Sequence, residues 1–133
     1  MLVTGGAKRV GAAICRRLHA AGASIAVHYL SSRSEAESLR KELNAQGAGS
    51  VFCEKADLLE LQALPVLVDK VVRHFGHLDA LVNNASSFYA MPLAGITEQH
   101  WNDLIGTNLK APLLLAQAAA AELRRRHGAI VNI

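Results

Sequence analysis

A glycine-rich segment near the start of the chain has the composition of a phosphate-binding turn. It reads Thr4-Gly5-Gly6-Ala7-Lys8-Arg9-Val10-Gly11 and follows the apolar pair Leu2-Val3. Small residues let the backbone approach a pyrophosphate closely, and the free N–H groups of the next helix point at the anion. A strand–helix turn of this kind also occurs without a ligand, so the phosphate interpretation depends on the strand before it and the helix after it. The residues that we predict to contact a dinucleotide are Gly5, Arg9, Val10 and Gly11.

The residues that close the second predicted strand favour NADP over NAD. An NAD site has an Asp or Glu about 20 residues beyond the turn, which accepts from the ribose 2′-OH. No acid is found there, and the sequence reads His28-Tyr29-Leu30-Ser31-Ser32-Arg33. Hydroxyl groups and an arginine suit a 2′-phosphate because they donate hydrogen bonds to an anion, and Arg9 adds a second cation. The alternative is that Ser32 and Arg33 only begin a solvated helix.

Short β-rich runs alternate with helical segments, and these elements must position both loops. Strands are predicted at 2–3, 24–29, 51–56, 78–82 and 129–133. Helices are predicted at 12–21, from a capping box of Ser34 and Glu37 to near 47, from near 65 to 76, and at 98–125 with Thr97 as the cap. Pro112 should kink or divide the last helix.

This alternation predicts an α/β fold, a Rossmann-like doubly wound parallel sheet that stops after the fifth strand. Right-handed crossovers place helices on both faces of such a sheet, and ligands bind beyond the carboxyl ends of its strands. We expect residues 1–133 to form one NADP-binding domain.

The composition excludes several classes of function. The chain has 133 residues, 51% hydrophobic and 19% charged, and a net charge of +3, which is too little to argue for nucleic acid. The run Arg124 to Arg126 is interpreted as the charged end of a helix. Cys15 and Cys53 have no metal-binding spacing and are predicted to be core residues, so no metal site is expected. No apolar run is long enough for a membrane span, and two free thiols without a signal peptide suggest the cytoplasm.

Over its whole length the chain resembles the short-chain dehydrogenase/reductase family. Four motifs occur in the family's order: the glycine turn, Asp57-Leu58 after the third strand, Asn83-Asn84-Ala85 after the fourth, and Thr107-Asn108-Leu109 in a helix. The resemblance implies that Asp57, Leu58, Asn84 and Ala85 contact the cofactor, NADPH, together with His28 and Tyr29. It also implies a catalytic role for Asn108, which holds a water in a proton relay in the family. The alternative is a structural role, in which Asn108 caps or kinks its helix.

Three departures from the general family pattern resemble the pteridine reductases. Arg9 replaces the middle glycine of the turn, His28-Tyr29 closes the second strand, and Ala85 is followed by Ser86-Ser87-Phe88-Tyr89 instead of glycine. The resemblance implies that Phe88 stacks on a pterin ring, that Ser86 contacts both cofactor and substrate, and that Arg9 reaches both as well. An aromatic face and a few donors suit a flat heterocycle. Taken alone, Phe88 would be interpreted as a loop aromatic packed on the protein.

The family's Tyr-x-x-x-Lys motif does not occur in this chain. Tyr29 and Tyr89 are followed four residues later by Arg33 and Leu93. We therefore expect an N-terminal part of a longer reductase, inactive alone, whose catalytic segment would follow the fifth strand. The family's dimer contact implies a homo-oligomer, dimer or tetramer, through the helix around 104–123, including Leu113, Leu114 and Leu115.

Three functions remain open at this point. The first is NADPH-dependent reduction of a dihydropterin or dihydrofolate C=N bond. The second is reduction of 3-oxoacyl or other carbonyl substrates, for which Phe88 would matter less. The third is a non-catalytic NADP-binding module.

Overall fold

The computed structural model describes residues 1–133 and contains five parallel strands flanked by helices on both faces. The strands are β1 (Leu2–Val3), β2 (Ile25–Tyr29), β3 (Val51–Lys55), β4 (Ala80–Asn83) and β5 (Ala129–Asn132). The helices are α1 (Arg9–Ala20), α2 (Arg33–Asn44), α3 (Ala63–Phe75), α4 (Glu98–Ile105) and α5 (Ala111–Arg126), with the 3-10 turn η1 (Leu93–Gly95) and the π-helix η2 (Gly106–Lys110). The sheet order is β3-β2-β1-β4-β5, which confirms the predicted doubly wound fold.

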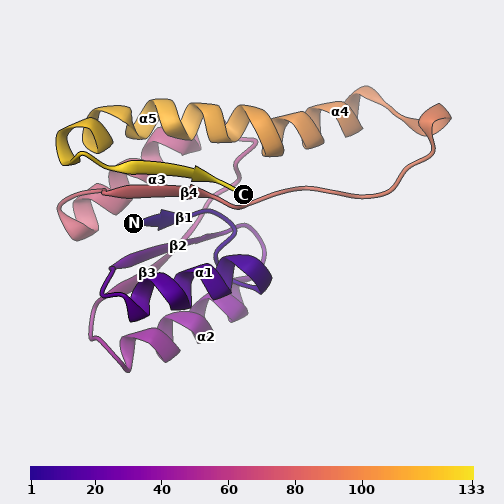
Figure 1. The fold of residues 1–133 in the computed structure, drawn as a ribbon. Coiled ribbons are helices and arrows are strands. Elements are labelled where there is room, and N and C mark those ends of the chain that lie inside the picture. Colours follow the sequence, from indigo (N-terminus) through magenta and orange to yellow (C-terminus); the bar gives the residue numbers. More distant parts are fainter.

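Alternation along the strands divides the core into two layers. Successive strand side chains point to opposite faces of the sheet. Leu2, Ala26 and Leu81 therefore pack with α3 and α5, while their neighbours along each strand pack with α1 and α2. Figure 1 shows these two helix pairs on opposite sides of the sheet. This arrangement leaves the carboxyl ends of β1 to β4 free for the loops that form the site.

The structure confirms one of the two predicted helix caps and contradicts the other. The predicted capping box at Ser34 and Glu37 is wrong: α2 begins at Arg33, and the Glu37 carboxylate pairs instead with Arg40 one turn along the helix, at 2.8 Å. Helix α1 begins at Arg9, three residues before its expected start. The cap at Thr97 is confirmed, since its side chain accepts from the backbone N–H of His100.

Pro112 divides the last helical region as predicted, but the break lies before it. Proline has no N–H to donate to the carbonyl four residues earlier, which here belongs to Asn108. The chain widens into the π-helix at Gly106–Lys110, and Pro112 falls in the first turn of α5. The wider turn lies where the loop after β4 approaches the helix, so it belongs to the site described below.

The apolar face of α5 that was expected to form a dimer contact exposes fewer leucines than predicted. Leu115 is fully buried in the core and Leu114 packs partly against it, so only Leu113 of the three is exposed, at 66%. Both cysteines pack in or against the core as predicted. Burial raises the pKa of the Cys15 thiol to about 12 and that of Cys53 to about 11, so neither forms a reactive thiolate near neutral pH.

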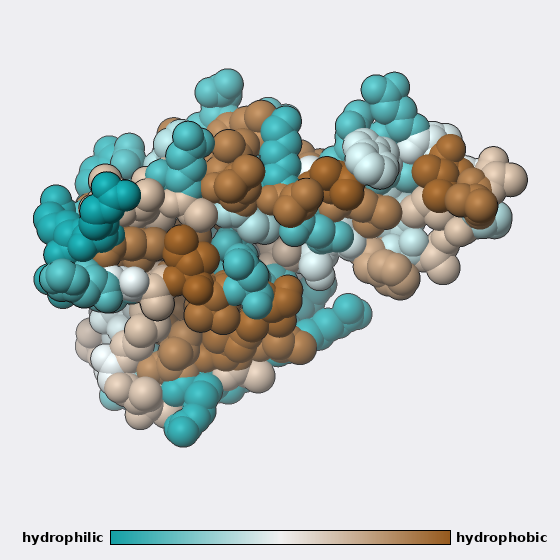
Figure 2. Space-filling model, turned by 45° about the horizontal axis from the view of Figure 1, so that its top comes forward, coloured by the Kyte–Doolittle hydropathy of each residue, from teal (hydrophilic) through white to brown (hydrophobic).

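An arm projects from the body between β4 and α5. The chain runs out from β4 to η1 and returns through α4 (Figure 1). Apolar surface continues along α5 and this arm (Figure 2). Large exposed side chains on it are Phe88, Leu93, Ile96, Trp101 and Leu109. No helix is long and apolar enough to cross a membrane.

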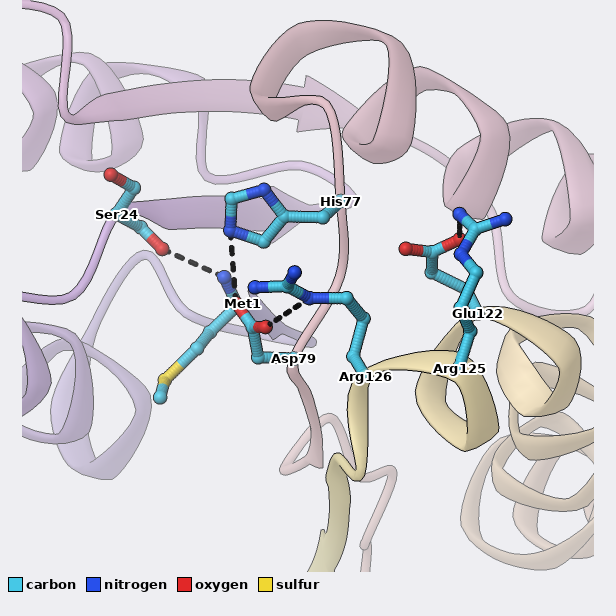
Figure 3. Close-up of polar contacts among 7 residues, drawn as sticks. All are labelled: Met1, Ser24, His77, Asp79, Glu122, Arg125 and Arg126. Carbon is cyan, nitrogen blue, oxygen red and sulfur yellow. Dashed lines mark hydrogen bonds and ion pairs between the residues drawn. The ribbon is translucent and has the colours of Figure 1, made fainter.

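A charged cluster around Asp79 lies before the start of β4, whereas the glycine turn follows the end of the parallel strand β1. Figure 3 shows the cluster. Asp79 accepts from Arg126 Nε at 2.9 Å and lies 3.1 Å from His77 Nε2. Arg125 pairs with Glu122, so two arginines of the helix end have internal partners. Partial loss of solvent raises the pKa of the Asp79 carboxyl, but the hydrogen bond and positive charge of Arg126 outweigh it. The pKa of this carboxyl is therefore lowered.

Replacing Asp79 with asparagine should lower the free energy of unfolding at neutral pH by only about 0.5 kcal/mol, because the pairs are more than one-third exposed. Folding lowers the pKa of Asp79 below its unfolded value of about 3.9. The ionised carboxylate therefore stabilises the fold above a pH of about 3.9, and this stabilisation is lost as the pH falls through the folded-state pKa. Thermal unfolding at pH 7 and pH 3 tests this, and the difference in Tm should be smaller at pH 3 than at pH 7. Asp69→Asn, at an exposed carboxylate without an ion pair, is the control.

Candidate functional site

A cleft of about 630 Å³ opens at the carboxyl ends of the strands. The loops after β1, β2, β3 and β4 all contribute to it, as the fold predicts. Most of the predicted site residues line it: Gly5, Arg9, Val10, Gly11, His28, Tyr29, Ser31, Ser32, Asp57, Leu58, Asn84, Ala85 and Ser86. The structure does not bring Arg33, Phe88 or Asn108 into this lining.

The glycine turn is closed tightly against the loop after β4. Gly5 has φ +60°, and a Cβ on it would lie 2.9 Å from the Ala85 Cα. A Cβ on Gly11 would lie 2.2 Å from the Gly5 carbonyl oxygen and 2.7 Å from the Asn84 side chain. No real Cβ can be accommodated at such distances. The two glycines therefore permit the close backbone approach that the sequence predicted for this turn.

Arg9 adopts a backbone conformation that is unusual for a bulky residue. Its φ is +52°, in the left-handed region, and its side chain is exposed at the mouth of the cleft. A non-glycine residue in this region costs about 1 kcal/mol or more, and such strain clusters at functional sites. The strained position supports a role for Arg9 that a glycine could not perform.

The side chain of His28 is engaged by the protein itself. Its Nδ1 accepts from the Gly5 N–H at 3.1 Å, and Nε2 lies 3.0 Å from the Ala56 carbonyl oxygen, to which it donates. Burial lowers the pKa of this imidazole, which favours the neutral tautomer that both contacts require. Because neither ring nitrogen is left for a ligand, His28 holds the glycine turn in place beneath the cleft.

Thr4 and Asn84 join the turn to the loop after β4. The backbone N–H groups of Asn84 and Ala85 donate to the Thr4 hydroxyl oxygen at 2.9 and 3.0 Å. The Asn84 side-chain amide donates to the carbonyls of Thr4 and Gly5 at 2.9 and 3.1 Å. Both hydrogens of the Asn84 amide are donated in these contacts, so Asn84 fixes the wall of the cleft.

Asn108 lies outside the cleft lining and contacts the backbone of Ser87. Its Oδ1 accepts from the Ser87 N–H at 2.9 Å, and its Nδ2 donates to the Ser87 carbonyl at 2.8 Å. The π-helix carries Asn108 to this position. Its side chain therefore holds the loop that carries Ser86 and Phe88, and its predicted water-relay role stays a prediction.

Phe88 projects into solvent in this structure. It is 87% exposed and is not part of the cleft lining, although the two residues before it, Ser86 and Ser87, do line the cleft. Its predicted stacking on a ligand stays a prediction.

Several cleft residues were missed by the sequence reasoning. Lys8, Leu59, Ser87, Asp103 and Thr107 all line the cleft. Lys8 was within the glycine turn and could have been identified as a second cation beside Arg9. Asp103 and Thr107 had no such signal, because only the packing of α4 and η2 against the loop after β4 brings them there.

Comparison with known proteins shows the family of this chain. The model of the short chain dehydrogenase family matches residues 1–133. The chain therefore belongs to the short-chain dehydrogenase family. It is 38% identical over 133 residues to a 3-oxoacyl-[acyl-carrier-protein] reductase of Staphylococcus aureus, covering 99% of this chain and 54% of that protein.

A pteridine reductase 1 of Leishmania tarentolae is 36% identical over 170 residues, covering 99% of this chain and 59% of that protein. Among solved structures, a blue fluorescent protein from a metagenomic library in complex with NADPH superimposes with a TM-score of 0.92 at 38% identity, covering 98% of this chain and 53% of that one. The chain spans about half the length of the relatives it matches.

Proposed function

We propose that this chain forms the NADPH-binding part of a short-chain oxidoreductase that reduces a pterin. The observation that carries the cofactor assignment is the chemistry at the end of β2. The hydroxyls of Ser31 and Ser32 line the cleft there without a carboxylate from β2, and Arg9 and Lys8 lie on the same lining. Hydroxyl and cationic donors favour a 2′-phosphate, whereas an NAD site has an acid at this point.

The residues present fit such a cofactor. The space left by Gly5 and Gly11 lets a pyrophosphate reach the start of α1, and Asp57 and Leu58 line the cleft where the adenine would lie. Arg33 is exposed outside the lining, so we assign the phosphate contacts to Ser31, Ser32, Arg9 and Lys8. The bound cofactor would supply a hydride. The chain's own residues bind and orient it, and the loop after β4 would border the substrate.

Titration of the purified chain with NADPH and with NADH tests the cofactor assignment. NADPH should bind at least about 100-fold more tightly, because the 2′-phosphate adds two or more charge-assisted hydrogen bonds. Equal affinity for the two cofactors would contradict it. The neighbour that contains NADPH supports this expectation.

The pterin assignment is supported by Arg9, Ser86 and Phe88, which lie in or beside the cleft. Similarity to 3-oxoacyl reductases favours a carbonyl substrate as a second candidate.

We expect Asn108 to act in catalysis, and we expect a cytoplasmic homo-oligomer that uses the exposed α5 face around Leu113. We expect no turnover from this chain alone, because it has no Tyr-x-x-x-Lys motif.

Replacing Phe88 with alanine should distinguish the two substrates. Phe88 is 87% exposed, so the substitution should leave thermal stability unchanged. Loss of an aromatic stacking face should weaken dihydrobiopterin binding by about tenfold. Calorimetric titration in the presence of NADP⁺, which prevents turnover, measures the effect.

Leu93→Ala, at an equally exposed apolar residue of the same arm, is the control for this experiment. Unchanged dihydrobiopterin affinity in Phe88→Ala would favour the 3-oxoacyl candidate. The same titration with a 3-oxoacyl thioester should show a smaller loss than with the pterin.

A further inference from the structure

Ser87 is the point at which the loop after β4 is fastened to the helical arm. Ser87 makes four hydrogen bonds to the helical arm, two through its backbone and two through its hydroxyl. Its neighbours Ser86 and Phe88 make none. Whatever holds Ser87 therefore determines where these two neighbours lie relative to the cleft.

The side chain of Ser87 contacts a carboxylate on α4. Its hydroxyl lies 3.2 Å from Asp103 Oδ1 and 3.2 Å from the Thr107 hydroxyl, and the Thr107 hydroxyl lies 3.5 Å from the same Asp103 oxygen. A hydroxyl has one proton to donate, whereas an ionised carboxylate only accepts. The consistent arrangement has Asp103 accepting from Ser87, with Thr107 as the second donor.

Asp103 is also close to the next part of the loop. Loss of solvent and, after it, the hydrogen bond and negative charge of Asp103 raise the pKa of the Tyr89 phenol. The Tyr89 ring is packed edge-on against His100 of α4, with the ring centroids 5.5 Å apart. The half-buried Asp103 thus faces the loop on both sides of Phe88, and it lines the cleft itself.

We propose that Asp103 is a positioning residue of the ligand site, which holds Ser86 and Phe88 in place through the hydroxyl of Ser87. This inference rests on the proposed function, because it assigns Ser86 and Phe88 to a pterin-binding loop. Asn108 holds the Ser87 backbone from η2, while Asp103 holds the side chain from α4. The two contacts act on one residue from two helical segments, so neither replaces the other.

The test measures ligand binding and loop order separately. In Asp103→Ala, exchange of the Ser87 amide with deuterium should accelerate about tenfold, which is the loss expected for one hydrogen bond to a charged group. Dihydrobiopterin should bind the NADP⁺ complex about tenfold more weakly, while NADP⁺ affinity stays within about twofold. Asp103→Asn should restore most of the protection of the Ser87 amide and most of the dihydrobiopterin affinity, since the amide oxygen still accepts a hydrogen bond.

A double-mutant cycle shows whether Asp103 acts through Ser87. Ser87→Ala combined with Asp103→Ala should bind dihydrobiopterin no more weakly than the weaker single variant, because both remove one contact. Asn102→Ala, at an exposed neighbour on α4, is the control and should behave as wild type.

Three outcomes would overturn the proposal. These are unchanged Ser87 exchange in Asp103→Ala, an equal loss of NADP⁺ and dihydrobiopterin affinity, and additive effects in the cycle. If the wild type binds no dihydrobiopterin, the pterin assignment fails, but Ser87 exchange still decides whether Asp103 orders the loop.

Discussion

Replacing Gly11 with alanine is expected to abolish NADPH binding and to destabilise the fold. The new Cβ would lie 2.2 Å from the Gly5 carbonyl oxygen and 2.9 Å from the Gly6 Cα, both backbone atoms. Backbone cannot rotate away as a side chain can, so the glycine turn must move off the loop after β4. Overpacking of this kind costs up to about 3 kcal/mol. The turn would also lose the geometry in which the start of α1 faces a phosphate.

Chemical denaturation and an NADPH titration measure the two effects. We expect a loss of NADPH affinity of at least about 100-fold, as the displaced turn carries the phosphate contacts. Gly95→Ala is the matched control, because a Cβ there meets only Pro92, at 4.0 Å. A stable Gly11→Ala variant with normal NADPH affinity would show that the turn does not bind the cofactor.

Ser32→Asp is expected to reverse the cofactor preference. A carboxylate at the end of β2 would repel a 2′-phosphate and accept hydrogen bonds from a ribose 2′-OH. Loss of one donor and gain of a like charge together should weaken NADPH binding about 100-fold or more. NADH affinity should rise, so the ratio of the two dissociation constants changes more than either value.

The same substitution two residues further on provides the control for this experiment. Ser34 is exposed on α2 and does not line the cleft, so Ser34→Asp should leave both affinities unchanged. Raising the salt concentration should weaken NADPH binding to the wild type more than to Ser32→Asp, because in the variant salt also screens the repulsion between the new carboxylate and the phosphate. If Ser32→Asp still prefers NADPH, the 2′-phosphate is recognised elsewhere.

Most features that depend on neighbours in the sequence were predicted correctly, although the capping box at Ser34 and Glu37 was not. The order of strands and helices follows from apolar periodicity, and the cleft follows from the carboxyl ends of parallel strands. Gly5 and Gly11 were identified because a close backbone approach requires glycine whatever surrounds it. The cap at Thr97 was also a local signal, as its hydroxyl accepts from a backbone group three residues away.

Features that depend on how distant segments pack could not be predicted. His28 was assigned to the cofactor, but the structure shows its ring bonded to Gly5 and Ala56 of other loops. Leu113 and Leu115 have the same residue type, and only the position of α5 on the sheet makes one exposed and the other buried.

The sequence alone therefore determined two features of the site. The glycine turn depends on the absence of side chains at Gly5 and Gly11, and the cofactor preference depends on the absence of an acidic residue after β2. The loop that carries Ser86 and Phe88 was decided by the tertiary structure. Ser87 is held by Asp103, Thr107 and Asn108, which lie 16 to 21 residues further along the chain. The π-helix before Pro112 brings Asn108 to the Ser87 backbone, and no local pattern encodes that contact.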